Sequence, residues 1–337
     1  MVLDAVGIMD ILFRFADPKA LGVAVEKGLF TKLSDGRTVD VREAAMLLGI
    51  EERPARFLLI HCTALGALKC EGGRYRNSSG AEEFLVEGRE GNLVGVVSMW
   101  NQRLYPAWEQ LLEAVQTNHP QTWGESDHFG SIFEDPRRTR LFLEAMHGLS
   151  TQSGRALARA FDFSRYPRLL DVGGGSGAYS IELARHFPRL RATVFDLAPA
   201  IAVAQEKIAA AGPRIARRVS TLVGDFFKGL PSGFDAFLLS MILHDWTPEE
   251  DVRILRNVWN ALASGGIVIV SELMMNDDGT GPLSAARMAG NMLVENRGFN
   301  YSWQDYERWL RKFGFRKIRR IPLESPAANG VIIGVKP

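Results

Sequence analysis

One histidine of the chain has neighbours that suit proton transfer. His244 and Asp245 follow a short apolar run that ends at Ser240, and Glu272 ends the next apolar run. If both runs are parallel strands, these side chains meet at the carboxyl edge of one sheet, where open α/β sheets bind ligands. A neutral imidazole accepts a proton near physiological pH, and a carboxylate on its other nitrogen would fix its orientation. The pattern predicts His244 as a general base beside two acids, and a structural histidine is the alternative.

A glycine-rich turn upstream could hold a ligand that carries a nucleotide. Leu169–Val172 has the pattern of a buried strand, Gly173-Gly174-Gly175-Ser176-Gly177 follows it, and a helix begins next. Glycines let the backbone take positive φ and approach a ligand closely, and a helix N-terminus offers free N–H groups. The turn also fits Gly-x-Gly-x-x-Ala through Gly173, Gly175 and Ala178, a pattern that would suit NAD.

Two acids further along the chain extend this ligand site. Asp196 ends the next strand, where a carboxylate can accept hydrogen bonds from both ribose hydroxyls of NAD or of S-adenosylmethionine, and a helix N-cap is the alternative role. Gly224-Asp225-Phe226-Phe227 follows the third strand. In methyltransferases this corner holds adenine, with the acid near the exocyclic amine and the ring on the base, whereas a turn Asp with two core phenylalanines is the alternative.

Strand and helix patterns alternate after Pro167. The runs expected as strands are Arg168–Val172, Ala192–Asp196, Ser220–Val223, Ala236–Ser240 and Ile267–Ser271. The expected helices between them are Ala178–His186, Ala200–Ala211 and Pro248–Ala263. This alternation predicts an α/β fold with a mostly parallel sheet and helices on both faces. Two closing runs, Lys317–Pro322 and Gly330–Val335, predict a terminal hairpin whose last strand is antiparallel, which is typical of methyltransferase sheets.

The first ninety residues have a mainly helical pattern. Helices expected over Val41–Leu48 and Glu51–Leu68 precede two short strands around Gly72-Gly73, which is a winged-helix pattern. Acids cancel the basic residues of this segment, so we favour a dimerisation module over a DNA-binding one. We expect a dimerisation domain over 1–90, a helical linker that contributes to the substrate pocket over 91–165, and a ligand-binding domain over 166–337.

Composition limits the cellular location and the partners. The chain has 337 residues, and its 40 basic and 39 acidic side chains give a net charge of +1. This balance provides no broad attraction to nucleic acid or an anionic membrane. Cys62 and Cys70 form no Cys-x-x-Cys pair, so a disulfide framework is not expected and a reducing cytoplasm is the predicted location. No apolar stretch approaches the roughly 20 residues that cross a bilayer.

Taken together, the motifs resemble the plant caffeate-type O-methyltransferases and their bacterial small-molecule relatives over nearly the whole chain. The resemblance rests on Asp171–Gly177, Asp196-Leu197, Gly224–Phe227, His244-Asp245-Trp246, and Ser264-Gly265-Gly266 leading to Glu272. It implies a seven-stranded Rossmann-like domain after a winged-helix domain. It also implies a homodimer in which Leu12, Phe13 and Phe15 are buried against the partner. The implied cofactor is S-adenosylmethionine, which leaves as S-adenosylhomocysteine, and the family needs no metal.

The resemblance also assigns roles to residues. Those implied to contact the cofactor are Gly173, Gly175, Asp196, Leu197, Gly224, Asp225 and Phe226, with Ser150 and Ser240 nearby. Met146 matches a family Met-x-x-x-Ser with Ser150 and would lie against the substrate ring. The other residues expected at an apolar, adaptable pocket are Trp100, Phe129, Met288, Asn291 and Met292. For each of these pocket residues, ordinary core packing is the alternative.

The implied reaction is methyl transfer to a hydroxyl of a phenolic small molecule in specialised metabolism. The sulfonium makes the methyl carbon electrophilic, and a phenol with a pKa near 10 becomes a good nucleophile once His244 removes its proton. The chain departs from the family at Asn300, where a second supporting Glu is expected. Glu295 either replaces that acid or is a solvated helix residue, and we favour the solvated interpretation.

Three alternative functions remain at this stage. The missing acid at Asn300 leaves open methylation of the ring carbon ortho to the phenol. A winged-helix regulator that senses S-adenosylmethionine without catalysis is disfavoured by His244, Asp245 and Glu272. An NAD-dependent dehydrogenase would leave the adenine corner and the terminal hairpin unexplained.

Overall fold

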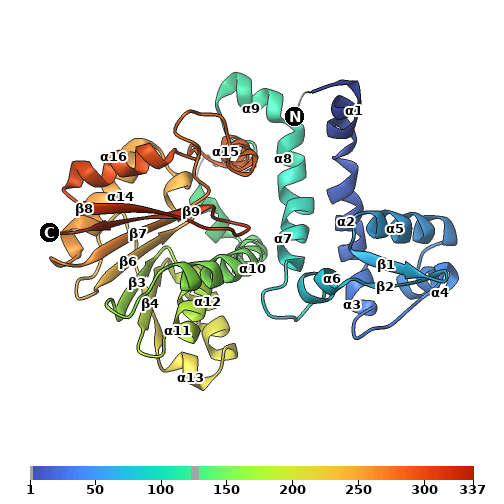
Figure 1. Ribbon diagram of the computed structural model, residues 1–337, viewed down its shortest axis with the longest axis horizontal. Coiled ribbons are helices and arrows are strands. Elements are labelled where there is room, and N and C mark those ends of the chain that lie inside the picture. The colour runs from blue at the N-terminus through green and yellow to red at the C-terminus, as the bar shows by residue number, and fades with distance from the viewer. Residues whose placement is uncertain (1–2, 123–128) are drawn as a thin grey trace. The chain divides into compact units, whose positions relative to one another are not determined.

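Contacts divide the chain into two units, Met1–Gln102 and Arg103–Pro337. The computed structural model describes residues 3–122 and 129–337, and Figure 1 labels their elements. The boundary between the units lies inside the segment 91–165 that we expected as a linker. The finer division into parts 1–90, 91–165 and 166–337 stays a prediction.

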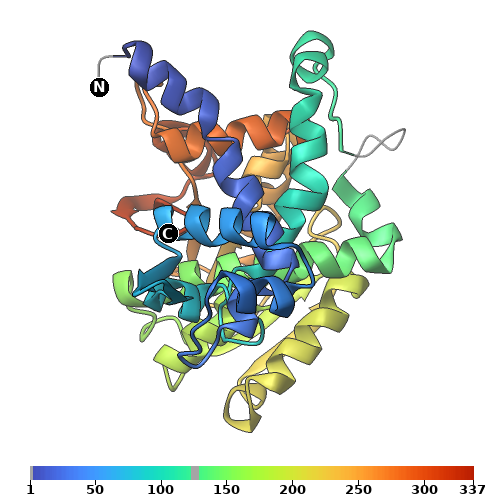
Figure 2. The ribbon, with the colours of Figure 1, turned by 90° about the vertical axis from the view of Figure 1, so that its right-hand side faces the viewer.

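The first unit contains the helix–helix–hairpin pattern expected from the sequence. Its elements are α1 (Ala5–Phe13), α2 (Ala16–Glu26), α3 (Leu29–Lys32), α4 (Val41–Leu48), α5 (Glu52–Ala64), β1 (Leu68–Glu71), β2 (Arg74–Asn77), α6 (Ser79–Phe84) and α7 (Val94–Met99). A capping box between Asp40 and Glu43 starts α4, and α5 packs on α4 and on β1 (Figures 1 and 2). Strands β1 and β2 pair antiparallel around Gly72 and Gly73, which both have positive φ and so permit the tight turn.

The second unit carries the sheet and most of the remaining helices. A π-helical turn, η1 (Trp100–Leu104), spans the boundary between the units. The helices that follow are α8 (Tyr105–Glu109), α9 (Leu111–Thr117), the 3₁₀ turn η2 (Phe129–Glu134), α10 (Pro136–Ala160), α11 (Ala178–His186), α12 (Ala198–Ala210), α13 (Pro213–Ala216), the 3₁₀ turn η3 (Leu243–Asp245), α14 (Pro248–Ala261), α15 (Leu283–Glu295) and α16 (Trp303–Phe313).

Seven strands form one sheet in this unit, in the order β5-β4-β3-β6-β7-β9-β8. Their bounds are β3 (Arg168–Val172), β4 (Arg191–Asp196), β5 (Val219–Val223), β6 (Ala236–Ser240), β7 (Ile267–Glu272), β8 (Arg316–Pro322) and β9 (Gly330–Val335). The first five strands of that order are parallel, and β9 runs antiparallel to both of its neighbours. The predicted seven-stranded α/β sheet with an antiparallel last strand is confirmed.

Alternate residues of the central strands pack into two separate hydrophobic cores, one on each face of the sheet. Leu169, Leu238 and Ile269 face a core shared with α10, α11 and α12, whereas the next residues along each strand face a core shared with α14 and α16. Figure 1 shows α14 and α16 on one side of the sheet and α11 and α12 on the other. Because both faces are covered, these strands are mostly apolar, as parallel strands in α/β folds usually are. Their carboxyl ends remain as the edge where polar side chains can gather.

Candidate active site

Strand β7 positions the carboxylate that holds His244. Glu272, the fully buried last residue of β7, places one oxygen against Nδ1 of His244. Its other oxygen accepts the backbone N–H of Ile242 at 3.0 Å and of Leu243 at 3.1 Å. Since β6 and β7 are parallel neighbours, the end of β7 lies beside the segment that follows β6. The structure thus brings together His244 and Glu272, and Glu272 holds both the ring and the turn that carries it.

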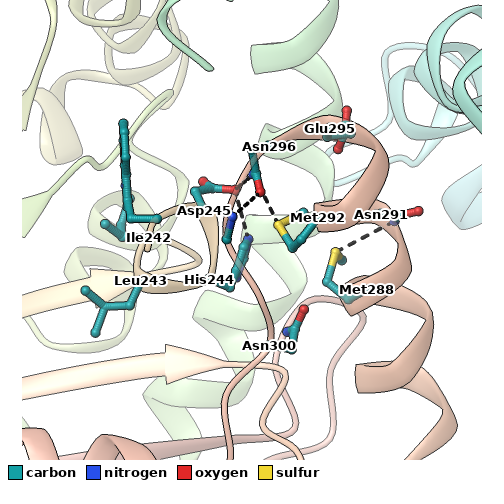
Figure 3. Close-up of polar contacts among 12 residues, drawn as sticks. Ile242, Leu243, His244, Asp245, Met288, Asn291, Met292, Glu295, Asn296 and Asn300 are labelled. Atoms are coloured by element: carbon teal, nitrogen blue, oxygen red, sulfur yellow. Dashed lines mark hydrogen bonds and ion pairs between the residues drawn. The ribbon is translucent and has the colours of Figure 1, made fainter. Parts of the chain in front are cut away.

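The second ring nitrogen of His244 faces another acid. Nε2 lies 3.5 Å from Oδ1 of Asp245, and both side chains are almost completely buried. That separation is longer than a hydrogen bond. Nε2 is therefore held less tightly by its neighbouring acid than Nδ1 is by Glu272. Figure 3 shows the ring of His244 and the carboxylate of Asp245 turned toward each other.

The charges around the ring favour the imidazolium form. Burial alone would lower the pKa of His244, but the adjacent carboxylates of Glu272 and Asp245 raise it to about 9. Burial raises the pKa of Asp245 to about 7, against the opposing effect of the His244 cation. The histidine therefore holds a proton at neutral pH and must release it before it can act as a base.

A loop after α15 holds Asp245 in place, and no sequence pattern indicated this contact. Asn296, the first residue beyond α15, donates from Nδ2 to Oδ1 of Asp245 at 2.9 Å. Its own Oδ1 accepts the backbone N–H of Gly298 at 2.8 Å. An asparagine just after an apolar helical stripe signals a helix end, but no spacing rule links it to an acid more than fifty residues upstream.

The expected second acid is replaced by an inward-facing amide. Asn300 is fully buried, and its Nδ2 donates to the carbonyl of Leu273 at 2.7 Å. Our interpretation of Glu295 as a solvated residue is wrong. The Glu295 side chain is only 12% exposed, and its Oε1 lies 2.7 Å from Nη2 of Arg103. Electrostatic coupling joins Glu295 to His244 and Arg103 to Asp245, so the pair belongs to the charge network of the site.

The glycine turn after β3 has the tight backbone that the sequence predicts. Gly173, Gly175 and Gly177 all have positive φ. A Cβ at Gly173 would overlap Cδ1 of Ile242, so the turn lies directly against the segment that carries His244. Gly177 caps α11, whose N-terminus therefore opens toward the turn.

Asp196 is bonded to this turn rather than standing apart from it. Its Oδ2 accepts the N–H of Gly175 at 2.8 Å, and its Oδ1 accepts the N–H of Leu197 at 2.7 Å. Burial raises the pKa of Asp196 to about 6, although these two amide bonds favour the ionised form. The N-cap role that we held as the alternative is wrong, because Leu197 is the N-cap of α12 and no side-chain cap bond is present there. The bond to Gly175 joins Asp196 to the glycine turn.

The corner after β5 lies close to the same turn. A Cβ at Gly224 would overlap the ring of Phe195, so only glycine fits there. Asp225 Oδ1 accepts the N–H of Phe227 at 2.9 Å. The ring of Phe226 reaches within 3.5 Å of a Cβ position on Gly173 and meets Trp246 edge to face at 5.8 Å between centroids. The corner thus places an acid and an aromatic ring beside the glycine turn.

Helix α10 carries Met146 and Ser150, and it packs on the glycine turn through residues that the sequence did not single out. Leu143 is the side chain that a Cβ on Gly175 would meet, at 3.6 Å. His147 Nδ1 lies 2.9 Å from Oγ of Ser176, and burial lowers the pKa of His147 to about 4, so the ring is neutral. Ser240 ends β6 and precedes Met241, which has a φ of 53°.

The pocket residues expected on α15 divide into two groups. Met292 is buried, and its sulfur accepts from Nδ2 of Asn296 at 3.3 Å, close to His244 (Figure 3). Asn291 accepts a hydrogen bond from Nε1 of Trp108 at 2.8 Å, and in Figure 3 its side chain points away from His244. The Nδ2 of Asn291 lies 3.7 Å from the sulfur of Met288. Met292 is therefore better placed than Asn291 to meet a substrate.

Two further expected pocket residues stay predictions. Trp100 is 42% exposed and belongs to the first unit. Phe129 begins η2, and its side chain lies outside the described part of the structure.

Comparison with known proteins identifies the family. Residues 108–316 match the O-methyltransferase domain family. The sequence is 45% identical to the 3-hydroxy-5-methyl-1-naphthoate 3-O-methyltransferase of Streptomyces sahachiroi, over 94% of this chain and 91% of that protein. The chain belongs to the O-methyltransferase family. It is also 32% identical to the tetracenomycin polyketide synthesis 8-O-methyltransferase of Streptomyces glaucescens, over 98% of this chain and 96% of that protein.

Solved structures agree with this assignment. Human N-acetylserotonin methyltransferase, crystallised with S-adenosylmethionine, is 26% identical and superposes with a TM-score of 0.88, over 98% of this chain and 96% of that chain. As a member of this O-methyltransferase family, the chain is an S-adenosylmethionine-dependent enzyme, as the sequence predicted. Among the described residues, no three His, Cys, Asp or Glu side chains gather where they could hold a metal ion. The helices of the described ranges lack the length and apolarity needed to span a bilayer.

Proposed function

We propose that this O-methyltransferase methylates the hydroxyl of a phenolic aromatic substrate in specialised metabolism, with His244 as the general base. The observation that carries the proposal is the buried contact between His244 and Glu272 at the carboxyl edge of the sheet. The two curated relatives are, by name, a naphthoate 3-O-methyltransferase and a polyketide 8-O-methyltransferase. We infer a flat hydroxylated ring system as the substrate class.

The protein residues prepare the hydroxyl for transfer. Glu272 fixes Nδ1 of His244, so Nε2 is the nitrogen that would receive the phenolic proton. The carboxylates of Glu272 and Asp245 then stabilise the imidazolium that results. Base assistance of this kind typically accelerates a reaction by roughly 10²–10⁴-fold. S-adenosylmethionine, when bound, supplies an electrophilic methyl group on a sulfonium.

The residues around the glycine turn fit this cofactor. Three glycines with positive φ allow close approach of a ligand to backbone N–H groups beside the N-terminus of α11. We assign the ribose hydroxyls to Asp196, with Leu197 beside it, and the adenine to Asp225 and Phe226. The remaining cofactor contacts that we propose are Gly173, Gly175, Gly224, Ser150 and Ser240. Met146, Met288 and Met292 would line the substrate pocket.

The N-terminal helices suit a homodimer interface. Helix α1 buries none of its residues, and Leu12, Phe13 and Phe15 are 59%, 63% and 66% exposed. Large exposed apolar patches usually mark a protein contact, and eight large apolar side chains within residues 3–15 are exposed. We propose that a second copy of the chain covers them, and light scattering behind size exclusion tests this, since a monomer at micromolar concentration contradicts it.

The cysteines bear on the cellular location. Two free cysteines, Cys62 and Cys70, suit the reducing cytoplasm that we propose as the location of the protein.

One isotope experiment tests the reaction and the base together. The purified enzyme is incubated with S-adenosylmethionine carrying a ¹³C methyl group and a hydroxynaphthoic acid, and the product is analysed by carbon NMR. We expect a signal in the methoxy region; an aryl-methyl signal would show that carbon is the acceptor. His244→Ala should abolish turnover while cofactor binding by calorimetry persists. His186→Ala, at an exposed histidine that ends α11, is the matched control and should keep wild-type turnover.

A further inference from the structure

The loop that follows α15 contacts each residue of the segment His244-Asp245-Trp246. Asn296 bonds the side chain of Asp245, and the hydroxyl of Tyr301 donates to the carbonyl of Trp246 at 2.8 Å. Between them, Gly298 packs against the backbone of His244 so closely that a Cβ there would overlap the His244 carbonyl oxygen. The loop thus contacts all three residues of the His-Asp-Trp motif.

Asn296 makes the contact in this loop that reaches a charged group of the site. Its side chain is 8% exposed. Its Nδ2 also lies 3.3 Å from the sulfur of Met292, and its backbone N–H donates to the carbonyl of Met292 at 2.8 Å. With Oδ1 taken by Gly298, the amide cannot flip without losing both the Gly298 and the Asp245 bonds. Figure 3 shows Asn296 between Asp245 and Met292.

We propose that Asn296 is a positioning residue for the reaction: it fixes the carboxylate of Asp245 and so holds negative charge beside Nε2 of His244. The inference rests on the proposed role of His244. It assigns Asn296 no contact with the reacting atoms, because its polar side-chain groups are used by protein partners.

Several titratable groups surround Asp245 and His244, and they also affect the charge on Asp245. Glu272 approaches from β7, Glu295 from α15, Asp251 from α14 and Arg103 from η1. Asp251 holds its own proton, so Glu272 and Glu295 are the anions that favour protonation of Asp245. A hydrogen bond donated by a neutral amide stabilises the ionised carboxylate without adding charge. Asn296 can therefore keep Asp245 ionised where burial and the neighbouring acids oppose it.

The test is the pH dependence of turnover in Asn296→Ala. Without the amide, Asp245 should be neutral over more of the pH range, and His244 should lose its proton at lower pH. We expect the ascending limb of kcat/KM to move down by about one pH unit. We expect the plateau kcat to fall roughly 10-fold, within the usual effect of acid–base groups. The dissociation constant for S-adenosylmethionine, measured by calorimetry, should change by less than about 3-fold, since Asn296 touches no proposed cofactor residue.

Asn300→Ala is the matched control. Asn300 is a buried asparagine of the same loop, but its amide donates to the carbonyl of Leu273 rather than to Asp245. Both alanine variants should lower the melting temperature, whereas only Asn296→Ala should move the limb. Asn296→Leu, which keeps the side-chain volume, gives a second measurement if the alanine variant unfolds, and the same shift is expected.

Two outcomes separate this inference from the function on which it rests. If Asn296→Ala and Asn296→Leu keep the wild-type pH profile while His244→Ala is inactive, the positioning role is wrong and the base assignment stands. If His244→Ala turns over normally, the proposed base is wrong, and with it the inference.

Discussion

The carboxylate of Glu272 joins β7 to the turn after β6: one oxygen contacts Nδ1 of His244 and the other accepts the N–H groups of Ile242 and Leu243. A single side chain thereby orients the imidazole and fixes the backbone on which it is mounted. Because Glu272 is fully buried, no water competes for these bonds. The ring orientation thus depends on one residue of the strand rather than on the flexibility of a loop.

Glu272→Gln should therefore separate the effect of Glu272 on the orientation of His244 from the effect of its negative charge. The amide can still accept the two backbone N–H groups, but the anion beside Nδ1 is lost. We expect kcat to fall by roughly 10²-fold, the lower end of what a general base contributes. Circular dichroism and cofactor binding should stay near wild type. Glu249→Gln, at an exposed acid of α14, is the control; equal kcat values for the two variants would refute the role of Glu272.

Sequence patterns predicted the sheet because its central strands β6 and β7 are buried along their length and read as short, mostly apolar runs. Arg168–Val172, Ala236–Ser240 and Gly330–Val335 were predicted with the bounds that are observed. The meeting of His244 and Glu272 was also foreseeable, since both follow neighbouring parallel strands. The role of Asn296 was not, because its partner lies 51 residues away in sequence and the approach depends on how the loop after α15 returns to the sheet. The burial of Glu295 was missed for the same reason: its partner Arg103 lies far upstream.

The pH dependence of wild-type turnover should show the charge on His244. Its pKa is raised to about 9 by Glu272 and Asp245 against the effect of burial. Below that pH the imidazolium dominates and cannot accept the phenolic proton, so kcat/KM should fall by roughly 10-fold for each pH unit. Asp245→Asn removes one anion and should move the limb to lower pH.

Comparing the pH profiles of these variants also tests whether ionisation of the substrate, rather than of His244, sets the limb of kcat/KM. The pKa of the phenol is a property of the substrate, so a limb set by it would not move between Asp245→Asn and the wild type. Asp278→Asn, at an exposed acid bonded to Thr280, should leave the profile unchanged. A limb at the same pH in all three proteins would contradict the assignment to His244.

The glycine turn should tolerate no side chain at Gly173. An alanine there would need a φ of 66° and would overlap Ile242, beside the segment that carries His244. Gly173→Ala should therefore weaken S-adenosylmethionine binding by roughly 10-fold or more, measured by calorimetry, since even a 1.4 kcal/mol loss is tenfold. Gly49→Ala separates backbone strain from crowding, because Gly49 has a φ of 63° and no atom within 4 Å of a Cβ. That variant should lose about 1 kcal/mol of stability and keep its cofactor affinity; similar affinities for both variants would contradict the proposed contact.

Asp251 should destabilise the protein at alkaline pH. Among the described residues, neither of its buried carboxylate oxygens has a hydrogen-bond partner. Burial and the nearby acids Glu272 and Asp245 raise its pKa to about 10. The folded state therefore holds this proton up to about pH 10, while the unfolded chain releases it above about pH 4. Because the unfolded state binds fewer protons across that range, the free energy of unfolding falls as pH rises through it.

Asp251→Ala removes this penalty and should stabilise the protein, increasingly so between pH 5 and pH 9. We expect the gain to grow by up to about 1.4 kcal/mol per pH unit, since the two states differ by one proton, less the small cavity that alanine leaves. Urea denaturation at pH 5, 7 and 9 gives the comparison. Asp278→Ala, at an exposed acid, should show no such trend. A loss of stability in Asp251→Ala that is the same at all three pH values would mean that Asp251 makes a favourable contact when folded, and that its neighbours do not hold it protonated.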